Sequence, residues 1–234
     1  MLSAEEWDIV LLSLKVSSVA VLLTLPIAFV LAWVLARARF PGKILLDALV
    51  HLPLVLPPVV IGWLLLIGFG NNGPVGRWLA DWFGLSVMFR WTGAALAAAV
   101  MALPLMVRAI RLSIEAVDQR LEMAARTLGA SRMDSFFSIT LPLASPGLLA
   151  AAVLGFARSL GEFGATITFV SSIPDETRTL PLAIYSALQT PGSDAMVTRL
   201  AVIAVILSLA ALVISEWLTR KAGRGRRQGL NHGL

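Results

Sequence analysis

The feature that most limits the fold of this chain is a series of long apolar runs with few or no charged residues. A helix needs roughly 20 apolar residues to cross about 30 Å of bilayer hydrocarbon. Of the 234 residues, 58% are hydrophobic and only 14% are charged, and the apolar runs recur along the whole length. This composition excludes an ordinary water-soluble domain. The chain is therefore predicted to be an all-α integral membrane protein.

Five apolar runs are predicted to span the membrane. Each reaches or nearly reaches the required length when the charged residues at its ends extend to the headgroups. The predicted spans cover about residues 9–36, 48–70, 91–107, 143–173 and 200–215. A further apolar stretch, residues 180–188, is too short to cross and is predicted to dip into the membrane from the outer side. Prolines inside the spans predict kinks: Pro26, Pro53, Pro57, Pro58 and Pro104.

The basic residues lie mainly on one side of the predicted membrane. Of the 19 lysines and arginines, 13 fall in two loops and in a C-terminal tail that share one side. Because cytoplasmic loops collect lysine and arginine, the N-terminus is predicted to lie outside and the C-terminus in the cytoplasm. The expected organisation is an outer N-terminal segment over residues 1–8, a membrane domain over residues 9–219 and a basic cytoplasmic tail over residues 220–234.

The inner loop between the third and fourth spans, residues 115–142, is predicted to fold as two short helices. Asp118 is suited to cap a helix that runs to Leu128, and Gly129 provides a left-handed stop. Ser131, with Asp134 three residues later, matches a capping box for a second helix. A compact helical pair on the cytoplasmic side suggests a docking surface for another protein.

The string EMAARTLGASRMDSFFSITLP in this loop resembles the EAA loop of ABC importer permeases. That family repeats a Glu-Ala-Ala run, a glycine and a terminal hydrophobic-x-Leu-Pro; Met123 departs from the pattern. The residues that fit it are Glu122, Ala124, Ala125, Gly129, Phe137, Ile139, Leu141 and Pro142. The resemblance implies a type I ABC importer permease bundle in which this loop forms two coupling helices. It also implies a second copy of the chain, two copies of a separate ABC ATPase subunit and an outer oxyanion-binding protein as partners.

Residues 157–194 narrow the resemblance to the molybdate permeases. The Gly-Glu-aromatic-Gly run at residues 161–164 also occurs in sulfate permeases, whereas residues 173–181 look more like the molybdate branch. The resemblance implies a permease subunit that carries molybdate across the bacterial inner membrane. A sulfate or tungstate permease of the same class is the alternative.

Arg158 and Glu162 are charged residues inside the fourth predicted span, so they must be paired or face a protein or water cavity. Being four residues apart, they either neutralise each other or line a translocation path, and both alternatives stay open. Thr166 and Thr168 either offer weak hydroxyl contacts to that path or bond to their own helix.

The sequence carries no constellation expected of an enzyme or a metal site. It contains no P-loop, so ATP is expected to be bound by the partner ATPase, and no cofactor is expected in this chain. With zero cysteines and two histidines no metal cluster can be assembled, and His51 is expected to be a packed or interfacial residue. The basic tail is expected to touch membrane lipid rather than nucleic acid. An ion-coupled secondary transporter is a further alternative, although Glu162 is the one acid well inside a span.

Overall fold

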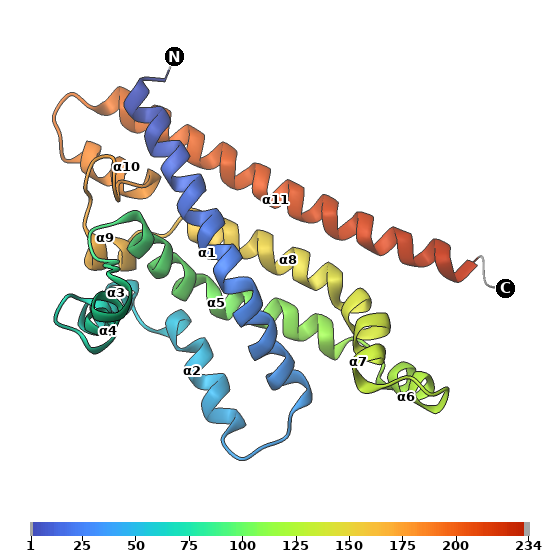
Figure 1. The fold of residues 1–234 in the computed structure, drawn as a ribbon. Coiled ribbons are helices and arrows are strands. Elements are labelled where there is room, and N and C mark those ends of the chain that lie inside the picture. The colour runs from blue at the N-terminus through green and yellow to red at the C-terminus, as the bar shows by residue number, and fades with distance from the viewer. Residues whose placement is uncertain (1, 232–234) are drawn as a thin grey trace.

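Four long helices form the body of the protein in a computed structural model, which describes the backbone of residues 2–231 and the side chains of residues 2–214 and 217. They are α1 (Ala4–Arg37), α5 (Trp91–Glu115), α8 (Leu141–Leu160) and α11 (Asp194–Asn231). Figure 1 shows α5, α8 and α11 running in similar directions, with α1 crossing them. The prediction of an all-α membrane protein is confirmed, since four helices of the described chain are long and apolar enough to cross a bilayer.

The helix α5 lies at the centre and packs against both α1 and α8. Its buried face is rich in alanine, and small residues let helices approach closely within a membrane. Two glycines of α8 extend this contact. A Cβ added at Gly147 would lie 2.2 Å from the Cβ of Ser113, and one at Gly155 would lie 2.5 Å from the sulfur of Met106. The absence of side chains at these two positions therefore sets the distance between α5 and α8.

The second predicted span, residues 48–70, is wrong as a single helix. It forms α2 (Lys43–Val55) and α3 (Pro58–Phe69), whose axes differ by 115°. Leu56 between them is extended, with φ −73° and ψ 144°. A residue that precedes proline is driven out of the helical region, and Pro57 and Pro58 follow in succession. The predicted kink is thus a sharp break, and α2 and α3 make a fifth crossing only if they count together as one.

The fourth predicted span, residues 143–173, is wrong at both ends. The helix begins in the inner loop, at α7 (Arg132–Ser135), and continues through a π-helical turn, η1 (Phe136–Thr140), into α8. It stops at Leu160, and a separate short helix, α9 (Gly164–Val170), follows. The Glu162 side chain accepts a hydrogen bond from the backbone N–H of Ala165, which caps the first turn of α9. The capping favours the break that the hydropathy pattern did not reveal.

Other boundaries also differ from the predictions. The first helix starts at Ala4 rather than near residue 9, because Ser3 and Glu6 form a capping box. Residues 4–8 are therefore helical and continuous with α1, and their place outside the membrane stays a prediction. The central helix α5 continues to Glu115, two turns beyond the predicted end, and α11 begins at Asp194 and includes the predicted tail as far as Asn231.

Apart from α2, which packs against α5, the helices outside the four-helix body lie toward its two ends. The short helix predicted over residues 180–188 is confirmed as α10 (Leu180–Leu188), and α4 (Pro74–Phe83) was not predicted. In Figure 1, α3, α4, α9 and α10 lie toward the end of the bundle that holds the N-terminus, whereas α7 and α6 (Gln119–Thr127) lie at the opposite end. The two halves of the predicted loop thus form a distinct projection.

Candidate functional site

The inner loop folds as its local signals predict. The Asp118 carboxylate accepts a hydrogen bond from the N–H of Arg120 at the start of α6, and Gly129 follows the helix with φ +94°. Ser131 and Asp134 bond reciprocally at the start of α7, which completes a capping box. Hydrogen bonds from the hydroxyl and the N–H of Ser131 hold the pKa of the Asp134 carboxyl below its ordinary value. The predictions of two helices, both caps and the glycine stop are confirmed.

The projection formed by α6 and α7 exposes large apolar side chains. Leu128 is 90% exposed, and Met133 and Met123 are 65% and 55% exposed. Leu121 and Phe137 are also exposed. An apolar group of this kind, rimmed by arginines at the end of the bundle, is typical of a surface that another protein covers. We call these five side chains the α6–α7 surface.

The small residues of the resemblance lie beside this surface. Ala124 and Gly129 are exposed, and Ala125 is half-buried on the same helix. Among the described residues, no heavy atom lies within 4 Å of a Cβ added at Gly129, so its left-handed backbone, not a steric contact, requires glycine there. Leu141 and Pro142 lie in the first turn of α8, at the base of the projection. The structure thus brings the predicted loop residues into one region of the molecule.

Glu122 faces inward from α6 and joins three segments. Its Oε1 lies 2.7 Å from Nη2 of Arg37, the last residue of α1, and accepts a hydrogen bond of 2.6 Å from the hydroxyl of Thr140. The side chains of Arg37 and Glu122 are only 14% and 25% exposed. Glu122 therefore links α6 to α1 and to the turn that leads into α8. A displacement of α6 would act on both helices through this one carboxylate.

The partners of Glu122 lie next to an aromatic group. Phe136 contacts Trp33 edge-on at 4.8 Å between ring centroids, and it also contacts Phe29 and Phe137. The Arg37 guanidinium lies 5.8 Å from the Trp33 ring centroid. The base of the α6–α7 projection is thus packed against the end of α1. The sequence did not indicate Arg37, Thr140 or Trp33 as parts of this site, because the contacts join segments that are distant in the chain.

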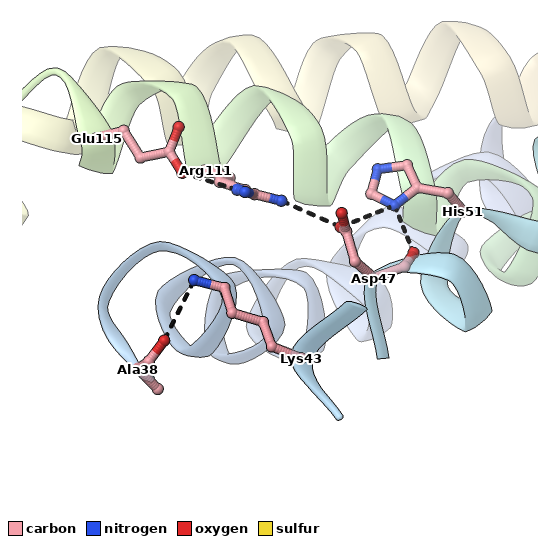
Figure 2. Close-up of polar contacts among 6 residues, drawn as sticks. All are labelled: Ala38, Lys43, Asp47, His51, Arg111 and Glu115. Carbon is pink, nitrogen blue, oxygen red and sulfur yellow. Dashed lines mark hydrogen bonds and ion pairs between the residues drawn. The ribbon is translucent and has the colours of Figure 1, made fainter. Parts of the chain in front are cut away.

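Side chains of alternating charge join α2 to the C-terminal end of α5, as Figure 2 shows. Arg111 bonds Glu115 on its own helix at 2.8 Å and Asp47 of α2 at 3.1 Å. Asp47 also lies 3.3 Å from His51 Nδ1, which contacts the Asp47 backbone oxygen at 2.8 Å. These residues and Arg108 line a cavity of about 330 Å³. His51 is therefore an interfacial residue between two helices, as predicted.

The charged pair of the fourth predicted span is formed, although its members lie on either side of the end of α8. Nη1 of Arg158 lies 2.6 Å from Oε2 of Glu162. The Glu162 side chain is 2% exposed, and its other oxygen accepts from the Ala165 N–H, so both carboxylate oxygens have partners. The ion pair that the first alternative requires is therefore present, and a role of the pair in lining a path stays a prediction. The pair also joins α8 to α9 across the break.

The two threonines of the proposed path lie in α9. The Thr168 hydroxyl donates to the Gly164 carbonyl of its own helix at 2.9 Å, and Thr166 is buried. A Cβ at Gly62 of α3 would lie 2.7 Å from the Cβ of Thr168, so the two helices touch there. For Thr168 the geometry matches bonding to its own helix. A role of these residues in a path stays a prediction.

Ion pairs also close the opposite end of the bundle. The buried Glu6 carboxylate of α1 lies 2.7 Å from Arg199 of α11, and Glu5 lies 3.3 Å from Arg178. The Ser13 hydroxyl accepts from the Leu180 N–H, which fixes the start of α10 against α1. The first turn of α1 therefore lies beside the start of α11, and its last residue lies beside α6.

The chain is similar in sequence and in fold to known transport proteins. The family of binding-protein-dependent transport system inner membrane components matches residues 24–224, which is most of the chain. The chain belongs to this family. Its members are inner membrane components, so the protein is a multi-pass inner membrane subunit, and its fold is that of an ABC importer permease.

Several relatives of this permease cover nearly all of its length. It is 60% identical to the molybdenum transport system permease protein ModB of Escherichia coli (strain K12), over 95% of this chain and 99% of that protein. It is 58% identical to the ModB protein of Haemophilus influenzae, over 93% of this chain and 95% of that one. The sulfate transport system permease protein CysT of E. coli (strain K12) is 40% identical, over 84% of this chain and 70% of that protein.

Solved structures support the fold of the permease. A bacterial ABC transporter involved in the import of the acidic polysaccharide alginate matches with a TM-score of 0.73 and 19% identity. The match covers 94% of this chain and 80% of that one. At this identity the likeness shows the fold alone.

Proposed function

We propose that this chain is the membrane-spanning subunit of an ATP-driven importer of molybdate. The single observation that carries the proposal is the 60% identity, over 95% of the chain, to a molybdenum transport system permease of E. coli. The identity to a sulfate permease is 40%. Sulfate, which is also a tetrahedral dianion, is therefore the second candidate cargo, and tungstate would be carried by the same chemistry.

The free energy for import enters through the α6–α7 surface in this proposal. Leu128 and Met133 would contact a groove of a separate ABC ATPase subunit, which binds the ATP, and this chain would need no cofactor of its own. Burial of those exposed side chains would supply affinity, since apolar burial contributes about 25 cal/mol for each Å² removed from water. Movement of the ATPase would reach α1 and α8 through Glu122, because that carboxylate bonds Arg37 and Thr140.

A path for the anion would form between two copies of the chain. The exposed apolar side chains of α2 and α3, such as Ile44, Val55 and Trp63, are available for a partner copy or for lipid. The N-terminus would face outward, where an oxyanion-binding protein would dock near α4 and α10. The α6–α7 surface would face the cytoplasm, in agreement with the distribution of basic residues. Arg158, Glu162, Thr166 and Thr168 stay candidates for lining the path.

Uptake of radiolabelled molybdate by cells that lack their own molybdate permease tests this function. Cells that express this chain with the matching ATPase and binding protein should accumulate the label at low external molybdate. An excess of unlabelled molybdate should compete far better than an equal excess of sulfate. Stronger competition by sulfate would identify sulfate as the cargo. Uptake that continues without the ATPase would instead support an ion-coupled transporter.

A further inference from the structure

A cavity lies at the end of α1, next to the coupling projection. It has a volume of about 350 Å³ and lies between the last turn of α1, the turn into α2 and the start of α6. The residues that carry its chemistry are Trp33, Arg37, Arg39, Lys43, Gln119 and Glu122. The volume is ample for a phosphate group with part of a glycerol attached.

The lining of the cavity is cationic. Three basic side chains face one carboxylate, and that carboxylate is already bonded by Arg37 and Thr140. Arg39 is exposed and makes no ion pair within the described part of the chain. Lys43 donates to the Ala38 carbonyl at 3.2 Å, which uses one of its three donors. The cavity therefore holds positive charge and hydrogen-bond donors that the described residues leave unmatched.

Arg37 adds an unmatched buried donor. Its Nε is buried and has no hydrogen-bond partner among the described residues, while Nη2 of the same group binds Glu122. A buried charged donor without an acceptor is costly. Arg37 also lines the cavity, so an anion there would interact with the charge of the guanidinium, while the enclosed Nε itself would stay without an acceptor. The charge of Arg37 thus adds to the excess of cations that favours an anionic occupant.

The surroundings of the cavity indicate where the anion comes from. Directly after Lys43, Ile44 and Leu45 are 87% and 65% exposed, and Phe40 precedes it on the surface. Trp33, on the α1 side, is of the residue type that concentrates at the headgroup level of membranes. Phosphate-binding cations next to exposed aliphatic side chains match a phospholipid, whose headgroup and acyl chains are joined in one molecule.

We propose that this cavity binds the phosphate of an anionic phospholipid of the inner leaflet. The proposal rests on the proposed function for the orientation, which places the end of α1 at the cytoplasmic surface. Arg39 and Lys43 bind the phosphate oxygens, and Ile44 and Leu45 contact the acyl chains. Because Arg37 lines the cavity and holds Glu122, a bound headgroup acts on the carboxylate that positions α6. Anionic lipid thereby stabilises the coupling projection.

Lipid retention by the purified full-length permease tests this site without any transport assay. The protein is extracted from bilayers of equal parts phosphatidylglycerol and phosphatidylcholine, and the lipid that stays bound is identified by native mass spectrometry. The wild-type chain should retain phosphatidylglycerol selectively. Arg39→Gln should weaken this binding about fivefold, which corresponds to the ~1 kcal/mol that a cation near a membrane surface contributes. Arg108→Gln is the matched control, because Arg108 is also an exposed cation but lines the separate cavity beside Asp47.

Three outcomes would overturn the proposal. Equal losses for Arg39→Gln and Arg108→Gln would mean a diffuse attraction to the membrane rather than a site. No preference for phosphatidylglycerol over phosphatidylcholine would remove the need for an anionic lipid. Competition by millimolar inorganic phosphate as effective as that by phosphatidylglycerol would assign the cavity to a soluble anion. A permease that failed to transport molybdate could still retain the lipid, so the two proposals can fail separately.

Discussion

Replacing Glu122 by glutamine should weaken the junction of α1, α6 and α8 far more than a surface substitution does. The change keeps an oxygen that can accept from Thr140 but removes the negative charge that Arg37 faces at 2.7 Å. Exposed ion pairs contribute about 0.2–1 kcal/mol, and breaking a fully buried pair costs about 3–5 kcal/mol. With Arg37 and Glu122 at 14% and 25% exposed, the pair lies between these limits. We expect a loss of about 1.5 kcal/mol, or roughly tenfold in the unfolding equilibrium.

The assay is reversible unfolding of the permease in mixed micelles of dodecylmaltoside and dodecyl sulfate, followed by circular dichroism. Glu115→Gln is the matched control, because Glu115 bonds Arg111 at 2.8 Å with side chains 28% and 42% exposed. Arg111 keeps its bond to Asp47 in that variant, so the loss should be about 0.5 kcal/mol or less. The double variant Arg37→Gln, Glu122→Gln should lose less than the sum of the two single changes. Strict additivity would mean that Arg37 and Glu122 do not stabilise each other, and equal effects of the two glutamates would mean that burial of the Arg37–Glu122 pair adds nothing.

Four further predictions concern other parts of the chain. Gly129→Val should reduce transport per ATP hydrolysed without preventing membrane insertion, because valine is strained at φ +94°; unchanged coupling in vesicles would contradict this. Glu162→Gln should destabilise the fold by leaving Arg158 unpaired. Arg158→Met with Glu162→Gln should restore folding, because it removes both charges and keeps an oxygen for the Ala165 N–H; if that double variant folds but transports nothing, the pair lines the path. Gly147→Ala should lower the free energy of unfolding by about 1–3 kcal/mol, and by more than Gly155→Ala does. The Cβ of Ser113 cannot move away from the added methyl group as the sulfur of Met106 can. A larger loss for Gly155→Ala would show that these contacts do not set the packing of α5 on α8. The start of α7 should lose its cap in acid, because the pKa of Asp134 is lowered in the folded chain. The contribution of Asp134 to stability is full above the ordinary aspartate pKa and disappears as the pH falls through the lower pKa of the folded chain. Asp134→Asn should remove this loss of protection from amide exchange at residues 131–135 in acid.

The parts of the fold that the sequence predicted are those fixed by neighbouring residues. Asp118, Gly129 and Ser131 act within one turn of the chain, so their capping roles could be deduced from spacing alone. The pairing of Arg158 with Glu162 follows in the same way from a separation of four residues.

The features that the sequence analysis missed depend on contacts between distant segments. Arg37 and Glu122 are 85 positions apart, and nothing in either local sequence indicates the other. The end of α8 at Leu160 was missed because apolar residues continue beyond it, so hydropathy alone could not show that a new helix begins at Gly164, with its first turn capped by Glu162. The double proline at residues 57–58 did signal a kink, but the 115° bend also depends on α3 packing against α9.

In the proposed function, ATP hydrolysis drives molybdate import through the α6–α7 surface. Paired measurements of ATP hydrolysis and molybdate uptake, in vesicles that contain the permease, its ATPase and the loaded binding protein, test this coupling. Leu128 is 90% exposed, so Leu128→Asp should leave the permease folded while it places a charge at the centre of the contact. We predict ATP-dependent uptake for the wild-type chain and at least a roughly tenfold loss for the variant, the equivalent of ~1.4 kcal/mol or more. Uptake that is unchanged in Leu128→Asp, or that proceeds without ATP, would show that the α6–α7 surface does not couple ATP hydrolysis to import.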